Sequence, residues 1–463
     1  MTTTAREREH ERSPRAAARA ADAGSPRVAA WTEERALAHL RSLELFGMRF
    51  GLQRMRALME LLRSPQRSFE SIHVVGTNGK SSTTHMAATI LERHGVRTGA
   101  YTSPHLVGYR ERIHIGAREL PGEAFARAIA RASAAAERVD RELPDEERVT
   151  QFELLTAAAF CAMHEAGVQI AVIEAGLGGR YDATSVIDAR VTALTSIGLE
   201  HTRWLGETQR EIAEEKLAAV GQGATLALGS RLAPEVLAVA ERVARERGAL
   251  LRHASECASG ARLLAKGAFQ RRNFALARLA AETSLLQTGA GLPDAPECER
   301  AACEAAASVL VPGRLQLLDG DPPTVLDGAH NPAAVAALLE SLPDVVGEQR
   351  LGLVFGVLDD KDAAGMLTPL AARCARVWLT APASERASSP AALALLAREC
   401  GAPCVTCERT PARALLAAQQ WARERAGAVL ACGSLYLVGE LLEQLGAFDT
   451  VETLNVPTGS ALR

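Results

Sequence analysis

One short stretch, residues 72–94, constrains the fold of this chain more than any other. A strand-like run over 72–75 leads into a glycine-rich loop, and a helical pattern over 83–94 follows at once. The loop reads Gly76, Thr77, Asn78, Gly79, Lys80, Ser81 and Ser82. Glycines let backbone N–H groups converge on an anion, the lysine adds a positive charge for the β- and γ-phosphates, and the helix N-terminus adds its dipole. The stretch therefore predicts a phosphate-binding loop and a nucleoside triphosphate ligand.

The loop is a shortened variant of the Walker A pattern. Val74 stands where the strict spacing requires glycine. A Gly-Lys-Ser turn can also be an ordinary mobile loop with no ligand, and that is the alternative interpretation. The strand before the loop and the helix after it favour the phosphate-binding interpretation.

Composition narrows the class of protein. The chain has 463 residues, a formal net charge of −3, 23% charged residues and 4% aromatic residues. This length suggests about two or three domains, and we expect two. The charge balance and scarce aromatics argue against a nucleic-acid surface. No apolar run reaches the roughly 18 residues of a membrane span, and the N-terminus lacks an apolar signal core. We therefore expect a cytoplasmic, monomeric protein that acts on small molecules.

The two ends of the chain are expected to be tails. Residues 1–27 are rich in Arg, Ala, Thr and Ser, but Glu7, Glu9 and Glu11 break the acid-poor pattern of a transit peptide. We predict a disordered tail over 1–27 and a second tail over 447–463.

Three of the nine cysteines form a pattern that needs weighing. Cys400, Cys404 and Cys407 have the C-x3-C-x2-C spacing of some iron–sulfur ligands. They lie late in the chain between amphipathic helical patterns, and residues 403–407 read as a short strand with alternating faces. We therefore expect reduced thiols here rather than a metal site.

Strand-like runs alternate with longer Ala-rich helical patterns, which predicts βα units and a largely parallel sheet. The first set of strands includes 99–102, 170–173 and 191–195, and long helices are expected over 152–166 and 234–247. The alternation restarts after Val311-Pro312-Gly313-Arg314, with strands expected at 324–326, 351–355, 377–379 and 428–431. The predicted fold is thus α/β, with a phosphate-loop domain over 28–310 and a smaller domain over 311–446. Ligands of such sheets lie beyond the carboxyl ends of the strands.

A second motif follows the strand-like run 170–173. It places Glu174 before the glycines Gly176 and Gly178, and Tyr181 and Asp182 close it. A carboxylate there, in the same sheet as the phosphate loop, is placed to hold Mg²⁺ against phosphates. A dinucleotide fingerprint fails, because Tyr181 occupies its third glycine position. The alternative for Glu174 is a capping or salt-bridged acid at a strand end.

Three further polar segments follow consecutive strands or lie near them. They are Tyr101-Thr102-Ser103-Pro104-His105-Leu106, Glu200-His201-Thr202 and Glu214-Glu215-Lys216. Taken singly, each is typical of a turn, a hydrogen-bonded histidine or a solvated helix face. Their order along the chain favours a common site.

These motifs together resemble one known family. They are Gly76 to Lys80, Ser103-Pro104-His105-Leu106, residues 174–182, His201 with Trp204-Leu205-Gly206, Pro312-Gly313-Arg314, and Asp327-Gly328-Ala329-His330-Asn331-Pro332. The set is similar to that of folylpolyglutamate synthase/dihydrofolate synthase, within the Mur ligase superfamily. The resemblance runs from about residue 36 to about residue 445.

The resemblance implies an ATP-dependent amide ligase whose phosphate-loop domain and smaller Rossmann-like C-terminal domain close over ATP. The implied nucleotide-binding residues are Gly76, Thr77, Asn78, Gly79, Lys80, Ser81, Ser82, Asn273, Arg314, Asp327 and His330. One or two Mg²⁺ ions are implied at Ser103, Glu174, His201 and, where it is carbamylated, Lys216. The implied pterin-site residues are Thr150, Tyr181, Asp182 and Ala183, and the implied catalytic residues are Lys80, His201 and Lys216.

The implied chemistry follows from these groups. A carboxylate reacts poorly with an amine, so its oxygen first attacks the γ-phosphate of ATP and forms an acyl phosphate. Metal ions and Lys80 neutralise charge on the transferring group. The amine of L-glutamate then attacks the acyl carbon and phosphate leaves. Domain closure keeps water from the acyl phosphate.

The chain departs from the family pattern at a few positions. Glu200 stands where aspartate is usual, Ser81 stands where glycine is common, and Lys216 is followed by Leu-Ala-Ala-Val instead of Ala-Gly-Ile. The stretch 251–273 is also short. Two other functions stay open at this point. One is a Mur-type amino-acid ligase acting on a non-folate carboxylate, and the other is a nucleotide-binding protein without ligase turnover. Within the folate interpretation, one or both of the dihydropteroate and folate activities are possible.

Overall fold

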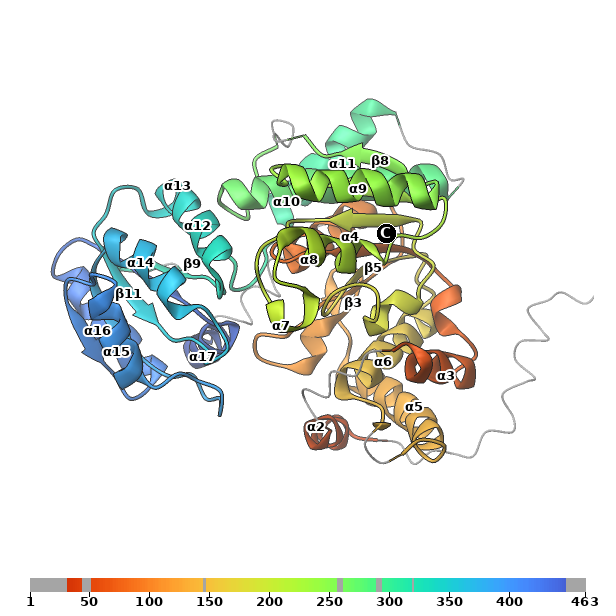
Figure 1. Ribbon diagram of the computed structural model, residues 1–463, viewed down its shortest axis with the longest axis horizontal. Helices are drawn as coiled ribbons and strands as arrows, with labels where there is room; N and C mark the ends of the chain where they lie inside the picture. Colours follow the sequence, from red (N-terminus) through yellow and green to blue (C-terminus); the bar gives the residue numbers. More distant parts are fainter. Residues whose placement is uncertain are drawn as a thin grey trace, which may run out of the picture.

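A computed structural model describes residues 31–43, 51–144, 147–255, 261–288, 294–318 and 320–446. The tails expected over 1–27 and 447–463 lie outside these ranges. The described strands form one eight-stranded sheet and one six-stranded sheet. Figure 1 shows them in two lobes, with the C-terminal lobe in blue on the left. This two-sheet α/β architecture confirms the predicted fold class. The domain limits at 28–310 and 311–446 stay a prediction.

The first sheet has the strand order β4-β3-β2-β5-β1-β6-β7-β8. Its strands are β1 Glu70–Val75, β2 Thr98–Tyr101, β3 Ile113–Ile115, β4 Arg118–Glu119, β5 Ile170–Glu174, β6 Val191–Leu194, β7 Thr225–Leu228 and β8 Leu250–His253. The pairs from β2 to β8 are parallel, and β3 and β4 add an antiparallel edge. Because β1 pairs with both β5 and β6, the carboxyl ends of these three strands meet at one edge.

Helices cover both faces of this sheet. One face carries α2 Glu33–Ser42, α3 Gln53–Leu61, α5 Gly122–Asp140 and α6 Gln151–Glu165. The other face carries α4 Lys80–Arg93, α10 Ala268–Gln287 and α11 Ala295–Ser308. The remaining elements of the lobe are η1 Pro65–Arg67, η2 Tyr109–Arg112, η4 Ala183–Val186, α7 Thr202–Leu205, α8 Gln209–Leu217 and α9 Pro234–Arg247.

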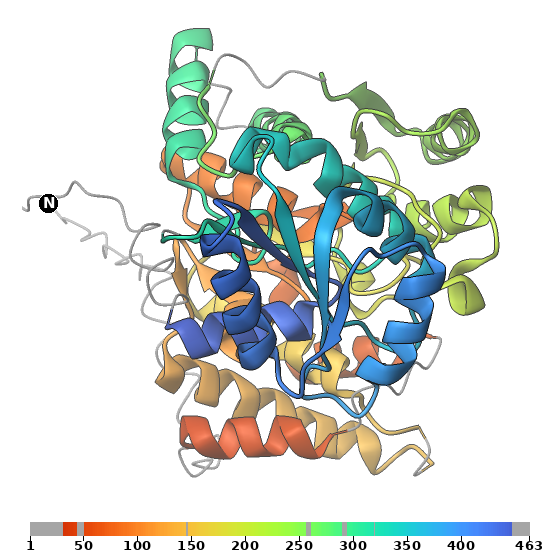
Figure 2. The same ribbon diagram turned by 90° about the vertical axis from the view of Figure 1, so that its left-hand side faces the viewer.

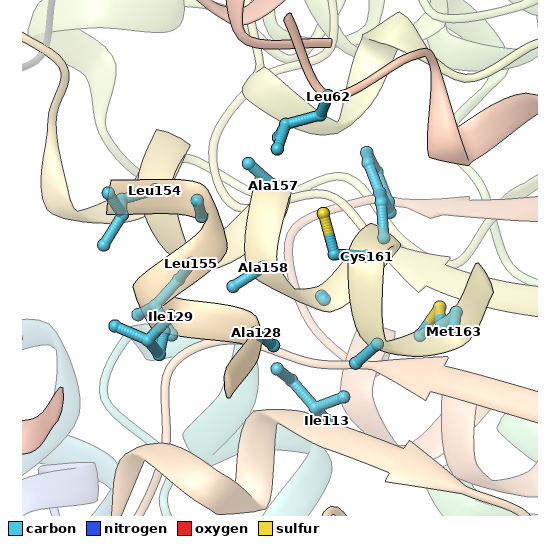
Figure 3. Packing of buried hydrophobic residues seen from close by; sticks show 14 of the residues in the cluster. Leu62, Ile113, Ala128, Ile129, Leu154, Leu155, Ala157, Ala158, Cys161 and Met163 are labelled. Carbon is cyan, nitrogen blue, oxygen red and sulfur yellow. The ribbon is translucent and has the colours of Figure 1, made fainter. Parts of the chain in front are cut away.

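Helix α6 shows why such an apolar sequence is helical and central. Its N-cap Thr150 accepts a hydrogen bond from the Glu153 backbone N–H, and the Glu153 carboxylate accepts one from the Thr150 backbone N–H. This capping box begins the helix. Leu154, Leu155 and Cys161 then pack against neighbouring helices and Ile113, as Figure 3 shows. The helix is buried on nearly every side, so it needs no polar stripe.

The second sheet has the order β13-β12-β11-β14-β10-β9, with only the β10–β9 pair antiparallel. Its strands are β9 Gln316–Leu318, β10 Thr324–Leu326, β11 Leu351–Phe355, β12 Cys374–Leu379, β13 Val405–Cys407 and β14 Ala428–Cys432. Its helices are α12 Pro332–Ser341, α13 Pro343–Val346, α14 Ala363–Arg373, α15 Pro390–Glu399, α16 Pro411–Arg423 and α17 Leu435–Leu445. Figure 2 looks onto this lobe, with the blue strands between helices.

Several predicted boundaries need correction. Helix α4 begins at Lys80 and not at residue 83, because Gly79 turns the chain at φ 88° and its carbonyl already accepts the Thr83 N–H. Glu174 is the last residue of β5 rather than the residue after it, because it still pairs with Val74. The expectation that Glu214-Glu215-Lys216 opens or lies within a helix is confirmed, because all three residues lie in α8.

A loop of the first lobe packs against an apolar cluster of the second. Leu106, in the loop after β2, packs against the apolar cluster that includes Leu437, Val438 and Leu441 of α17. A Cβ on Gly439 would collide with the backbone carbonyl of Leu106, so only glycine allows this approach. The Leu106 loop is itself held by backbone N–H bonds to the Glu111 carboxylate.

Polar contacts also join the lobes. The side-chain amides of Asn78 and Asn331 exchange two hydrogen bonds, of 3.1 and 3.0 Å. Arg231 and Arg272 of the first lobe both pair with Glu340 of α12, at 2.8 and 3.0 Å. Within the ranges described, the longest and most apolar helices still fall short of what crossing a membrane requires.

Candidate active site

A cavity of about 470 Å³ lies between the two lobes, at the carboxyl ends of the first sheet's central strands. It collects most of the nucleotide and metal positions predicted from sequence. Those in its lining are Thr77, Asn78, Gly79, Lys80, Ser81, Ser82, Ser103, Glu174, His201, Asn273, Arg314, Asp327 and His330. Open α/β sheets place their ligands at this edge.

The phosphate loop is shaped by its glycines and by β6. The backbone N–H groups of Thr77 and Asn78 bond to the backbone oxygen and the hydroxyl of Ser196. A Cβ on Gly79 would lie 2.5 Å from the side-chain oxygen of Asn273, so Asn273 can close over the loop only beside glycine. Gly76 lies behind the loop, where an added side chain would meet Thr195. The Lys80 ammonium donates to the Thr77 carbonyl at 3.0 Å, so it is folded over the loop.

Glu174 is the most buried acid of the cavity, with 1% of its surface exposed. Its two carboxylate oxygens accept hydrogen bonds from the Ser81 hydroxyl at 3.1 Å and the Ser103 backbone N–H at 3.2 Å. Burial raises the pKa of Glu174, and the charge of Lys80 opposes that rise. The hydrogen-bond partners of Glu174 come from the phosphate loop and from the predicted metal-ligand loop, so Glu174 joins these two loops, and its role as a metal ligand stays a prediction.

His201 is the N-cap residue of α7 and has a left-handed backbone conformation, with φ 53°. Non-glycine residues rarely adopt this conformation, and where they do it is often at a functional site. Burial lowers the pKa of His201 to about 4, so its imidazole is neutral near pH 7. A neutral ring can offer a nitrogen lone pair to a metal ion.

Lys216 is 5% exposed and does not line the cavity directly. Burial, followed by the nearby charge of Lys80, lowers the pKa of Lys216 to about 7. With a pKa of about 7, a substantial fraction of the Lys216 amine is unprotonated near neutral pH. The glycine-rich loop after β5 packs on the Lys216 backbone, because a Cβ on Gly179 would collide with the Lys216 carbonyl.

Arg314 and Asp327 are brought into the cavity by the C-terminal lobe. The Asp327 carboxylate accepts the backbone N–H of Leu315 and of Ala329, both at 2.7 Å. These bonds tie the segment that carries Arg314 to the end of β10. Burial raises the pKa of Asp327, and the Arg314 charge opposes that rise.

The four predicted substrate positions lie apart from the cavity lining. Thr150 caps α6, and Asp182 is buried, where it accepts the backbone N–H groups of Leu177 and Thr184. Ala183 begins η4, and Tyr181 is 47% exposed beside the glycine-rich loop. Thr150 and Asp182 therefore have structural duties, and a role for these four in substrate binding stays a prediction.

Sequence reasoning missed three cations of the cavity lining, Arg231, Arg272 and Lys361, and the last of them contacts Glu200. Lys361, in the loop after β11, lies 3.0 Å from the Glu200 carboxylate, and His330 Nε2 lies 2.9 Å from the same oxygen. Burial alone would raise the pKa of Glu200, but the His330 hydrogen bond and the charges of His330 and Lys361 hold it well below its usual range. The local signal was an Asp-Asp-Lys-Asp run after a strand, which is equally typical of a solvated turn.

The donor set fits a hard divalent cation that is shared with phosphates. Among the described residues, no group of three or more His, Cys, Asp or Glu side chains could hold a metal ion, and this covers Cys400, Cys404 and Cys407. Mg²⁺ commonly takes only one or two carboxylates and completes its shell with phosphate oxygens and water. Glu174, with Ser103 and His201 in the same cavity as Lys80, meets that requirement.

A phosphate loop that faces a second α/β lobe across such a cavity is consistent with the two domains of a Mur ligase. The family models agree, since residues 74–222 match the Mur ligase middle domain and residues 313–435 match the Mur ligase glutamate ligase domain.

Known proteins narrow the family. The chain is 35% identical over 382 residues to the dihydrofolate synthase/folylpolyglutamate synthase of Mycobacterium tuberculosis. The aligned region covers 75% of this chain and 77% of that protein. A crystal structure of M. tuberculosis folylpolyglutamate synthase complexed with ADP and AMPPCP has a TM-score of 0.81 and 31% identity, over 89% of this chain and 99% of that one. The structure of the bifunctional Yersinia pestis folylpolyglutamate synthase/dihydrofolate synthase complexed with AMPPNP and a Mn ion has a TM-score of 0.75 and 28% identity. The match covers 91% of this chain and 100% of that one.

This chain belongs to the folylpolyglutamate synthase/dihydrofolate synthase family, which consists of ATP-dependent ligases. The family predicted from the sequence is thus confirmed, and the comparisons give no support to the alternative of a Mur-type amino-acid ligase acting on a non-folate carboxylate. A nucleotide co-substrate and a divalent metal ion are supported by the ligands of the two solved structures.

Proposed function

We propose that this chain uses ATP to join L-glutamate to folates, and also to dihydropteroate, through an acyl-phosphate intermediate. The observation that carries this proposal is the convergence of Lys80, Glu174 and His201 with C-terminal cations in one cavity between the lobes. The family membership supplies the substrate class.

Each residue has a task that its position supports. The phosphate loop and Lys80 bind the β- and γ-phosphates, with Arg314 approaching from the second lobe. Asn273 and Asp327 help to hold the nucleotide, the latter by fixing the Arg314 segment. The carboxylate substrate attacks the γ-phosphate, ADP leaves, and the glutamate amine then displaces phosphate from the acyl carbon.

We propose Mg²⁺ as the metal, held by Ser103, Glu174 and His201, where it supplies positive charge for the transferring phosphoryl group. Carbamylation of Lys216 would turn its amine into a carboxylate-like oxygen pair, and a lysine whose pKa is about 7 has the free amine that this reaction needs. Thr150, Tyr181, Asp182 and Ala183 are proposed to border the pterin site. We further propose a monomer that acts in the cytoplasm, with domain limits at 28–310 and 311–446.

The test is ADP release with Mg²⁺-ATP and L-glutamate, in parallel reactions with dihydropteroate, with tetrahydrofolate and without a pterin. Stimulation by both pterins is expected. Stimulation by one alone would restrict the activity to that branch, and stimulation by neither would refute the folate assignment. Lys80→Ala should abolish glutamate-dependent release, because it removes the cation beside the phosphates. Lys266→Ala is the matched control, since Lys266 is exposed and lies outside the cavity. Near-normal turnover of Lys80→Ala would contradict the assigned role.

A further inference from the structure

The Glu200 side chain, from the first lobe, contacts two residues of the second lobe through one carboxylate oxygen. It lies in the loop between β6 and α7 of the first lobe, while Lys361 and His330 belong to the second. Its oxygen Oε1 lies 3.0 Å from Lys361 Nζ and 2.9 Å from His330 Nε2. The three side chains are 9%, 12% and 24% exposed, in the order Glu200, Lys361 and His330. Lys361 and His330 therefore bind a carboxylate, and in this structure that carboxylate is the side chain of Glu200.

His330 is oriented to hold an anion. Its Nδ1 lies 2.8 Å from the Gly328 carbonyl oxygen, and its Nε2 faces the Glu200 carboxylate. Both partners are acceptor oxygens, so a ring nitrogen that carries a hydrogen can donate to the oxygen that it faces. Lys361 and His330 thus present two donors toward one point in the cavity.

The other cations of the cavity have different partners. Among the described lining residues, Arg231 and Arg272 pair with Glu340 of α12. Lys80 lies over the phosphate loop, and Arg314 is held beside Asp327 and Glu174. A substrate amino acid that enters with its carboxylates ionised needs a cation as well. Within this lining, the Lys361–His330 pair differs from Lys80, Arg314 and the two Glu340-bound arginines in its partner, because its carboxylate comes from Glu200.

Glu200 can leave this pair without unfolding its loop. Two residues earlier, Gly198 is anchored to the phosphate loop by hydrogen bonds of both its N–H and its carbonyl with the Thr77 hydroxyl. Leu199 is 56% exposed and has no such anchor in the core. Rotation of the Glu200 side chain is therefore enough to free the two cations.

We propose that Glu200 is an internal competitor for the incoming amino acid: it occupies the Lys361–His330 pair until a carboxylate of L-glutamate displaces it. Glu200 is then a specificity-determining residue that sets the affinity for L-glutamate. This inference rests on the proposed ligation of glutamate. The apparent affinity for L-glutamate falls in proportion to the fraction of protein in which the Lys361–His330 pair is free. If Glu200 occupies the pair in about 90% of molecules, apparent binding weakens about tenfold.

The experiment is steady-state ADP release with saturating Mg²⁺-ATP and pterin and with L-glutamate varied. Glu200→Gln keeps the length of the side chain but removes its charge, so the KM for L-glutamate should fall by about three- to tenfold while kcat stays within about twofold. Glu200→Asp, the second variant, draws the carboxylate back from Lys361 and should lower KM in the same direction. Lys361→Met should raise KM for L-glutamate and leave KM for ATP nearly unchanged.

The matched control is Glu340→Gln, which weakens the two ion pairs that Glu340 makes across the lobes with Arg231 and Arg272 but touches neither Lys361 nor His330. It should leave KM for L-glutamate unchanged. An unchanged or higher KM in both Glu200 variants would overturn the inference, as would an equal fall in Glu340→Gln, which would indicate a general effect of loosened lobes. If the unmodified protein shows no glutamate-dependent ADP release at all, the proposed function fails and the inference fails with it. Normal release with unchanged KM in the variants removes the inference alone.

Discussion

The amide pair between Asn78 and Asn331 provides a direct measure of how strongly the lobes assist nucleotide binding. Asn78 is in the phosphate loop and Asn331 precedes α12, 253 residues later. Two neutral hydrogen bonds join them, and each is worth about 0.5–1.5 kcal/mol net, so their coupling should be about 1–3 kcal/mol. Because the nucleotide cavity lies between the lobes, losing this coupling should weaken nucleotide affinity by about 5- to 150-fold.

Asn331 has a second task that must be separated from the first. Its side-chain oxygen also accepts the Ala334 N–H at 2.8 Å and caps α12, so Asn331→Ala loses a cap worth about 1 kcal/mol as well. Asn331→Asp keeps the capping oxygen but loses the amide donor to Asn78. It should therefore weaken the contact between the lobes while α12 stays capped.

The assay is a double-mutant cycle with Asn78→Ala, Asn331→Ala and the double variant, read as dissociation constants of a non-hydrolysable ATP analogue by calorimetry. The cap contribution cancels in the cycle, and the coupling remains. Ser389→Ala is the control, because it removes the N-cap of α15 in the same lobe and should leave nucleotide affinity unchanged. A coupling energy below about 0.3 kcal/mol in folded variants would refute the reasoning, since that is the size expected of independent sites.

Two predictions concern buried charge. The pKa of Lys216 falls from its ordinary 10.5 to about 7 on folding, so the unfolded chain binds more protons between these values and the free energy of unfolding should rise with pH across that interval. Chemical denaturation at several pH values should show a flatter rise in Lys216→Met, and identical slopes would contradict the pKa shift. Arg54→Met should lose about 3–5 kcal/mol of stability, because it strands the buried Glu153 carboxylate that Arg54 Nε contacts at 3.1 Å. The exposed pair Arg127–Glu165 is its control, since Arg127→Met should cost below about 1 kcal/mol, and equal losses would show that burial does not set the cost.

The parts of the site that were visible in the sequence are those built from neighbouring residues. The phosphate loop is a strand, a glycine turn and a helix start in one run of the chain, and its geometry is nearly all local. Glu174 was recognisable for a similar reason, because an acid at the end of an apolar strand is rare enough to be noticed. Even there, the helix start was misplaced by three residues, since Gly79 and not an N-cap side chain begins α4.

The parts that were missed depend on contacts across long stretches of chain. Lys361 meets Glu200 across 161 residues, and Arg54 meets Glu153 across 99. Nothing in the residues around Lys361 distinguishes it from a lysine in a solvated turn. Only the docking of the second lobe, which brings β11 opposite the end of β6, makes it part of a site.

The contact of Leu106 with α17 has a mechanical consequence. Leu106 is three residues after Ser103. The loop that carries Leu106 toward η2 is held by the Glu111 carboxylate, which accepts the backbone N–H groups of Leu106 and Val107. Its apolar side chain is seated among residues of the second lobe, so swinging that lobe away must either pull the leucine out of its seat or drag the loop along. In the second case the backbone N–H of Ser103 is withdrawn from Glu174 as the lobes part. The same hinge motion that admits solvent would then dismantle the proposed metal site, and closing the lobes would rebuild it.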